Sequence, residues 1–337
     1  MGVVTMTTVT MPVLAARTLT DVLAMVQPGL QAVEARMREV SIDQHEALAY
    51  AIDQLLAAGG KRVRPAVALL AAELFKAPHA RSVALAAAVE MLHTATLVHD
   101  DLVDNSVLRR GHPTLNARWS PAATVLAGDF LFARAAELAS QAESVPVMSA
   151  FARTLMIIVN GELTQMFSGR QHPSREDYLK RIYGKTASLF EVAALSPAVL
   201  AGAPAAHVEA MRLFGREAGM AFQIVDDVLD FVSDEARLGK PAGSDLRQGL
   251  ITLPALCYLE LHPGDPDLAG LLNGHAGDPA AVDRVVRAVR ESGAAAAAMD
   301  EARVYVARAQ AALALVPDNV HRQALGDLAD LFVNRNV

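Results

Sequence analysis

Cysteine is almost missing from this chain of 337 residues, which contains only Cys257. A single thiol excludes an internal disulfide and a zinc site built from several cysteines, and it is typical of a reducing cytoplasm. Basic residues are also in deficit, since the net charge is −7. Wholesale binding of nucleic acid is therefore not expected, and the lysines and arginines that matter are those that cluster.

Aromatic residues make up only 5% of the chain, whereas hydrophobic residues as a whole reach 53% and alanine is abundant. This composition favours closely packed helices over a β-fold. No apolar run reaches the roughly 18–20 uncharged residues of a membrane span, and no basic start precedes an apolar segment as in a secretory signal. We expect a cytoplasmic protein without a transmembrane segment. The mean hydropathy of +0.26 leaves an oligomer interface or peripheral contact with a membrane open.

Helical periodicity begins near Leu19 and continues almost to the C-terminus, with no alternating strand pattern. Gly and Pro occupy the breaks, and the stretch 262–279 is typical of a surface excursion. We expect a flexible segment over 1–17 and a single domain over 18–337. The predicted helices span 18–39, 43–58, 65–76, 80–107, 120–142, 146–169, 175–183, 186–201, 205–233, 248–261, 279–292, 298–315 and 319–334.

Two copies of one acidic pattern stand out against this apolar background. They are Asp100-Asp101-x-x-Asp104 and Asp226-Asp227-x-x-Asp230. Positions i and i+4 share a helix face, so the first and third aspartates of each copy point the same way. Two such faces turned toward each other place four carboxylates around one cavity, where they repel unless cations are bound. Mg²⁺ prefers carboxylate and phosphate oxygens, so the pair of motifs predicts a clamp for a diphosphate.

Basic residues cluster near the acidic motifs and predict anion sites. Arg109 and Arg110 follow the first motif, where they either hold an anion or cap the C-terminus of the acidic helix. The run GGKRVRP at 59–65 places three cations in a loop that leads into a helix. A basic loop at a helix N-terminus is an anion site, although its spacing is not that of a Walker A loop.

Further candidates lie in three other segments. The run GKT at 184–186 opens a predicted helix and offers backbone N–H groups, the ammonium of Lys185 and the hydroxyl of Thr186. Gln223 precedes the second acidic motif by three residues and shares its helix face. The Gly-rich loop that contains Lys240 is either a lid over a diphosphate or an ordinary connection between helices.

His93 lies seven residues before Asp100, two helical turns away on nearly the same face. A lone histidine in such a place is more often a core residue than a ligand. It becomes a candidate only because Lys61 and Arg64 could meet it at a second anion site.

Together these segments resemble the trans-isoprenyl diphosphate synthase family, also called the polyprenyl synthetases. The matching pieces are GGKRVRP, EMLHTATLVHDDLVDNSVLRRGHPT, GKTASLF, FQIVDDVLDF and GKPAGSDLRQGLITLP, in family order between residues 59 and 254. Five ordered motifs are far more specific than one DDxxD. The resemblance implies the all-α isoprenoid synthase fold, a single-domain helical bundle around a deep central cavity, and a homodimer. The two acidic motifs would face each other at the mouth of that cavity.

The resemblance also implies a role for each matching residue. Three Mg²⁺ ions per active site would bind between the aspartates and an allylic diphosphate, either farnesyl or geranylgeranyl diphosphate. The direct metal ligands would be Asp100, Asp104 and Asp226, while Asp101, Asp227 and Asp230 act nearby or through water, and Lys185 joins these six as a catalytic residue. The allylic diphosphate would be held by Arg109, Lys185, Thr186, Gln223 and Lys240. Isopentenyl diphosphate would be held by Lys61, Arg64, His93 and Arg110.

The implied reaction needs no nucleophilic serine or cysteine. Mg²⁺ and the cationic side chains neutralise the leaving diphosphate, so the allylic C–O bond ionises. An apolar cavity keeps water away from the carbocation. The double bond of isopentenyl diphosphate then attacks, and loss of a proton leaves an all-trans polyprenyl diphosphate.

The length of the product depends on the helix that leads into the first acidic motif. Ala95 and Thr96, five and four residues before Asp100, are small, so the growing chain should pass them; Met91 and Leu92 are the next obstacles. The motif also lacks the two-residue insertion of bacterial farnesyl-type enzymes. We expect a product longer than C20, such as a quinone side-chain precursor, with a geranylgeranyl diphosphate synthase as the alternative.

One position departs from the family pattern, because Leu250 stands in QGLITLP where many members have Lys. One contact to the diphosphate is therefore missing.

A terpene cyclase would share the first acidic motif, but its second metal motif usually carries Asn, Ser and Glu, and it lacks GGKRVRP. A subunit of a heteromeric synthase tends to lose aspartates, whereas this chain keeps all six. Both remain alternatives from other functional classes.

Overall fold

The computed structural model describes residues 17–39, 45–57, 59–109, 111–167, 174–233, 241–272 and 279–334. About 79% of the chain is helical, and the described strands form one short antiparallel hairpin. The helices up to the middle of the chain are α1 (Leu19–Ala24), α2 (Gln27–Arg38), α3 (Glu46–Ala57), α4 (Val63–Phe75), α5 (His79–Val103), α6 (Pro121–Ser140), α7 (Val145–Phe167) and α8 (Arg175–Ile182). The later helices are η1 (Tyr183–Ala187), α9 (Ser188–Leu200), α10 (Ala205–Val232), α12 (Ser244–Arg247), α13 (Leu253–Leu261), α14 (Pro266–Leu272), α15 (Pro279–Glu291), α16 (Ala294–Leu313) and α17 (Val320–Val333). The hairpin joins β1 (Leu108–Arg109) to β2 (His112–Pro113).

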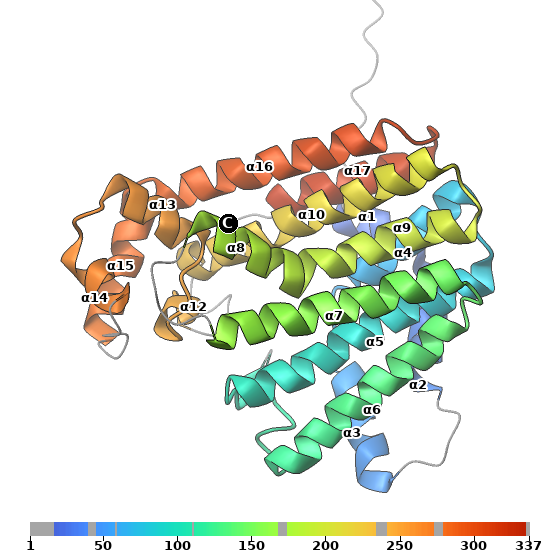
Figure 1. Cartoon of the computed structure of the whole chain (residues 1–337), viewed down its shortest axis with the longest axis horizontal. Helices are drawn as coiled ribbons and strands as arrows, with labels where there is room; N and C mark the ends of the chain where they lie inside the picture. Colours follow the sequence, from blue (N-terminus) through green and yellow to red (C-terminus); the bar gives the residue numbers. More distant parts are fainter. Residues whose placement is uncertain are drawn as a thin grey trace, which may run out of the picture.

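The long helices lie side by side in one bundle (Figure 1). Helix α10 packs against α9 and α16, and α5 packs against α4 and α6. Small residues make these approaches possible. A Cβ atom added to Gly215 of α10 would lie 2.4 Å from the carbonyl oxygen of Phe190, and one added to Gly219 would lie 2.6 Å from the Cα atom of Ala187. The alanine-rich composition therefore corresponds to closely packed helices, as the sequence predicts.

Several predicted helices differ in extent from the observed ones. The helix predicted over 18–39 is interrupted between α1 and α2, where Pro28 lies in the first turn of α2. Proline cannot donate the hydrogen bond that would continue the preceding helix. The helix predicted from 248 begins only at Leu253, again with a proline in its first turn. The helix predicted over 80–107 ends at Val103, and the β1–β2 hairpin that follows was not expected.

The segment 262–279, predicted as a surface excursion, contains the short helix α14, which the sequence did not predict. Its Leu268 and Leu271 are buried, and it packs against α15. The short α12 was also missed, because four residues are too few to show a helical period. The predicted flexible segment 1–17 lies outside the described residues except for Arg17, which pairs with Asp327.

The run GKT at 184–186 does not open a helix, contrary to the prediction. It lies within η1, a π-helical turn that joins α8 directly to α9. Wide turns of this kind inside α-helices often occur at functional sites. The backbone N–H groups of this segment are consequently not those of a free helix N-terminus.

Among the described helices, α5 is long and apolar enough to cross a membrane by length and composition, although the sequence predicts no such run. In its most apolar window 72% of the residues are buried inside the protein. Helix α5 is therefore a helix of the protein core, and α4, α6 and α9 pack around it.

Candidate active site

The two acidic motifs lie at the C-terminal ends of α5 and α10, and they meet at one cavity of about 840 Å³. In Figure 1 both of these helix ends lie at the same end of the bundle, near α8 and α12. The motif aspartates that line the cavity are Asp100, Asp104, Asp226, Asp227 and Asp230, and Asp245 lines it as well. The opposed arrangement that the sequence predicts is therefore present.

The six aspartates divide into an accessible group and a buried group. Asp104 and Asp226 are exposed and Asp100 is half-buried. The other three, Asp101, Asp227 and Asp230, are all 5% exposed or less. The accessible group consists of the residues expected to bind metal directly.

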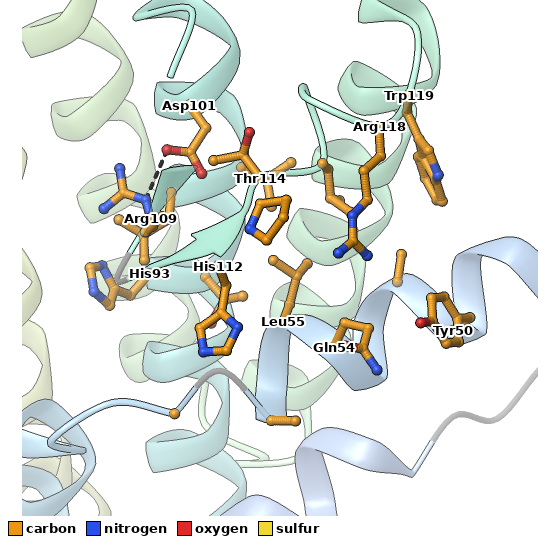
Figure 2. A pocket seen from close by; sticks show the side chains of 18 of the residues that line it. Tyr50, Gln54, Leu55, His93, Asp101, Arg109, His112, Thr114, Arg118 and Trp119 are labelled. Carbon is orange, nitrogen blue, oxygen red and sulfur yellow. Dashed lines mark hydrogen bonds and ion pairs between the residues drawn. The ribbon is translucent and has the colours of Figure 1, made fainter. Parts of the chain in front are cut away.

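Asp101 is turned away from the main cavity and binds Arg109. The guanidinium Nε of Arg109, on β1, donates to Asp101 Oδ1 at 2.8 Å (Figure 2). Burial raises the pKa of Asp101, and the charge of Arg109 only partly opposes this shift. Asp101 thus fixes the hairpin arginine at the rim of the cavity, which Arg109 itself lines.

Lys185 lies between two carboxylates. Its Nζ is 3.2 Å from Asp100 Oδ2 and 3.0 Å from Glu162 Oε1 on α7. Burial lowers the pKa of Lys185, but the two carboxylates outweigh it and leave the pKa raised. The ammonium group therefore stays charged beside the first acidic motif, where it can neutralise an anion.

A chain of hydrogen bonds connects Asp227 to the residues predicted to hold a diphosphate. Tyr178 Oη donates to Asp227 Oδ2 at 2.8 Å, and Gln223 Nε2 donates to Asp227 Oδ1 at 2.7 Å. Thr186 Oγ1 in turn donates to Gln223 Oε1 at 2.6 Å. Burial, followed by the charge of Asp245, raises the pKa of Asp227 to about 7. Asp227 consequently organises its neighbours from within the protein.

The residues predicted to hold the second anion, isopentenyl diphosphate, also face the main cavity. Lys61, Arg64 and His93 all line it. The guanidinium carbon of Arg64 lies 5.0 Å from the ring centre of Phe190 and 5.9 Å from that of Phe222, as in a cation–π contact. The cavity thus brings together the acidic motifs and both groups of cations.

The chain is similar to known proteins in both sequence and structure. The profile of the polyprenyl synthetase family matches residues 45–290. The chain belongs to the polyprenyl synthetase family. It is 39% identical over 282 residues to the octaprenyl diphosphate synthase of Haemophilus influenzae, covering 82% of this chain and 85% of that protein. It is also 39% identical over 320 residues to a geranyl-diphosphate-specific all-trans-nonaprenyl-diphosphate synthase of Rhodobacter capsulatus, covering 94% and 97%.

A solved structure agrees with this assignment. The polyprenyl synthase of Caulobacter crescentus, crystallised with calcium and isoprenyl diphosphate, has a TM-score of 0.89 and 38% identity, covering 96% of this chain and 99% of that one. The expected family, the all-α isoprenoid synthase fold and the class of prenyl diphosphate synthases are thereby confirmed.

Two predicted site residues of this polyprenyl synthetase, Arg110 and Lys240, lie outside the described residues. Leu250, which replaces a common lysine, lines the main cavity and therefore presents an apolar side chain to it. Thr96 also lines this cavity. The other residues considered for product length, Ala95, Met91 and Leu92, are buried and do not line it.

Sequence reasoning gave no individual role to four residues that the structure connects to the site. They are Glu162, Tyr178, Arg62 and Glu90. A glutamate inside an apolar helical run, as in both α5 and α7, is a signal that could have found two of them. Nothing local distinguishes Tyr178 from an ordinary core tyrosine, because its partner lies 49 residues away.

The donor chemistry of the main cavity suits a hard divalent cation, because accessible carboxylates face it from both helices. Within the described parts of the chain, no three acidic, histidine or cysteine side chains form a metal-binding group by themselves. Oxygens of a bound diphosphate and water would therefore have to complete the coordination of any ion.

A smaller cavity of about 210 Å³ lies on the other side of α5, beneath the hairpin. Figure 2 shows it between Tyr50 and Gln54 of α3 and the segment that carries Thr114 and Trp119. It shares a wall with the main cavity, since His93 and Arg109 line both.

Proposed function

We propose that this polyprenyl synthetase condenses isopentenyl diphosphate with an allylic diphosphate to make an all-trans product longer than C20, a precursor of a quinone side chain. The main support for this function is that one cavity is lined by both acidic motifs and by two groups of cations. The octaprenyl and nonaprenyl synthases among its relatives support the long product over a geranylgeranyl product. Farnesyl and geranylgeranyl diphosphate are the proposed primers.

Asp100, Asp104 and Asp226 would hold Mg²⁺, with three ions per site when the diphosphate is bound. Bound Mg²⁺ supplies positive charge that stabilises the departing diphosphate. The other three aspartates, Asp101, Asp227 and Asp230, would support these metal ligands without binding metal directly, because each is buried. The Caulobacter crescentus polyprenyl synthase was crystallised with calcium and isoprenyl diphosphate, which supports the use of a divalent cation.

The basic side chains that line the main cavity would hold the two substrates at separate positions, oriented for reaction with each other. Lys185 and Arg109 would bind the allylic diphosphate together with Thr186 and Gln223, whose positions Asp227 fixes. Lys240 is proposed for the same diphosphate from the sequence alone. Preorganised charges of this kind lower the barrier because they need no rearrangement as the charge on the leaving group develops.

Lys61, Arg64 and His93 would hold isopentenyl diphosphate across the cavity, and Arg110 is proposed for it from the sequence alone. Leu97 and Phe222 are apolar residues that line the same cavity. Apolar walls keep water from the reacting carbon atoms, which favours attack by the double bond over hydrolysis.

We propose a homodimer formed through the exposed apolar side of α7. Met156, Val159, Leu163 and Met166 recur at helical spacing there, and all four are 45% or more exposed. Phe167 extends the stripe and is 83% exposed. A contiguous apolar surface of this kind marks an interaction site. The cytoplasm is the proposed location of the dimer, with peripheral membrane contact as a further proposal.

The test is an incubation with Mg²⁺, labelled isopentenyl diphosphate and each of the geranyl, farnesyl and geranylgeranyl primers. Product lengths are read by mass spectrometry. We expect a ladder that ends well beyond C20 and that disappears when EDTA is added. A single C20 product would replace the proposal with a geranylgeranyl diphosphate synthase.

A lack of elongation by the purified chain would contradict the proposal for the chain acting alone. The same incubation with extract from the source organism would then test for a heteromeric enzyme. Formation of a hydrocarbon or an alcohol without elongation would instead favour a terpene cyclase.

A further inference from the structure

Arg62 has a backbone conformation that its neighbours in the sequence do not explain. Its φ and ψ are 48° and 33°, in the left-handed region, at the residue that precedes α4. The other described non-glycine residues with positive φ are Lys76, Asn105 and Glu143, which all follow the ends of helices. A left-handed residue is ordinary after a helix. Before a helix it is disfavoured for a residue with a Cβ atom, so other contacts must hold it.

The side chain of Arg62 supplies those contacts, because it binds three different helices. Its Nη1 donates to Glu90 Oε1 of α5 at 2.8 Å, and its Nε donates to Glu34 Oε1 of α2 at 3.3 Å. Its Nη2 donates to the carbonyl oxygen of Leu56 in α3 at 3.2 Å. The Arg62 and Glu90 side chains are only 13% and 7% exposed. A buried ion pair with good geometry is costly to break, since the remaining charge is left without compensation.

Arg62 stands in the sequence between Lys61 and Arg64, and all three residues line the main cavity. The nitrogens of the Arg62 guanidinium differ from those of its neighbours in that each donates to α2, α3 or α5. Glu90, its main partner, lies one helical turn before His93 on α5. The ion pair therefore ties the loop that carries Lys61 and Arg64 to the helix that carries His93.

We propose that Arg62 and Glu90 are positioning residues for the isopentenyl diphosphate site. This inference rests on the proposed function. Both residues line the main cavity, but the Arg62 nitrogens donate to Glu90, Glu34 and Leu56, so the pair sets the distance between the basic loop and His93. Loss of the pair should therefore weaken isopentenyl diphosphate binding while leaving the allylic diphosphate site, formed by α5, β1, η1 and α10, nearly unchanged.

The test is steady-state kinetics with each substrate varied in turn, on the Glu90→Gln and Arg62→Lys variants of the full chain. Glu90→Gln keeps the shape of the side chain but removes its charge, and Arg62→Lys keeps the charge but removes the fork that reaches three helices. Both should raise KM for isopentenyl diphosphate by roughly tenfold, since small misplacements of binding groups have effects of this order. KM for the allylic diphosphate and kcat should change less than about twofold.

Arg134→Lys is the matched control. Arg134 is 5% exposed, pairs with Glu137, and donates to the carbonyl oxygens of Arg36 and Glu39, and it lines neither cavity. It should lower the melting temperature without a selective effect on isopentenyl diphosphate. The proposal is overturned if Glu90→Gln and Arg62→Lys leave that KM unchanged, or if both substrates weaken together as thermal stability falls.

Failure of the proposed function is a separate outcome, because the wild-type chain would then not elongate any primer. Arg62→Gly gives an additional check on the backbone. Glycine adopts the left-handed conformation without strain, so a selective rise in KM in this variant would show that the anchored side chain is what positions the loop. A KM equal to that of the wild type would overturn the role of the Arg62 side chain.

Discussion

Asp100 and Asp227 have the same side chain in equivalent motifs but lie in different surroundings. Asp100 is half-buried and 3.2 Å from the ammonium group of Lys185. Asp227 is 4% exposed and accepts hydrogen bonds from Tyr178 and Gln223. An accessible carboxylate can bind a metal ion that in turn binds diphosphate, whereas a buried carboxylate with two donors orders its neighbours.

Replacing an accessible aspartate should abolish turnover without unfolding the chain. We expect Asp226→Ala to lower kcat/KM by roughly 10³ or more, because it removes charge that acts only on the developing diphosphate. Helicity by circular dichroism should match that of the wild type, since Asp226 is exposed. The same result is expected for Asp100→Ala. Near-normal activity in either variant would remove the metal clamp from the mechanism.

Product length should respond to Thr96, the residue four before Asp100 that lines the main cavity. A phenylalanine at this position projects into open space, so Thr96→Phe should shorten the product while the first condensations continue. Mass spectrometry of the product ladder is the measurement. Ala95→Phe also tests the expectation from the sequence, but Ala95 is fully buried, so a loss of stability of about 1–3 kcal/mol is expected with it. An unchanged ladder in Thr96→Phe would show that the chain grows along another path.

At the level of elements, α5 has two faces with different tasks. One face carries His93, Thr96 and Asp100 along the main cavity. The neighbouring face carries Asp101, which binds the hairpin arginine beside the smaller cavity. Successive residues of an α-helix point about 100° apart, so one buried helix serves both the site and its support.

Close packing between α9 and α10 can be tested at Gly215. A Cβ atom there would lie 2.4 Å from the carbonyl oxygen of Phe190 and 2.8 Å from the Cα atom of Glu191. Because both neighbours are backbone, Gly215→Ala should lower the free energy of unfolding by about 1–3 kcal/mol, measured in urea. Gly264→Ala is the control, since nothing lies within 4 Å of its added Cβ. Equal stabilities for the two variants would contradict the close approach of the helices.

At the level of the whole molecule, one end of the bundle holds the chemistry and one side offers an apolar surface. The acidic motifs meet where α5 and α10 end (Figure 1). The apolar stripe runs along α7, which also carries Glu162 beside Lys185. Association through α7 would therefore steady a helix that forms part of the site.

The proposed dimer predicts a change in molecular mass when charge is placed on α7. Met156→Glu combined with Leu163→Glu should give a monomer in light scattering, because burial of two carboxylates in an apolar interface is unfavourable. Leu315→Glu is the control, since Leu315 is 65% exposed and lies away from this helix. A dimer that persists in the double variant would place the interface elsewhere.

The sequence by itself determined the helical class, the approximate position of most helices, and the residues proposed to carry the chemistry. These features depend on local periodicity and on side chains whose chemistry is the same in any fold. The tertiary structure alone decided which aspartates are accessible, that GKT lies in a π-turn within a continuous helix, and that Arg62 pairs with Glu90 of α5. Each of these depends on which distant helix covers a given face, and no local pattern contains that information.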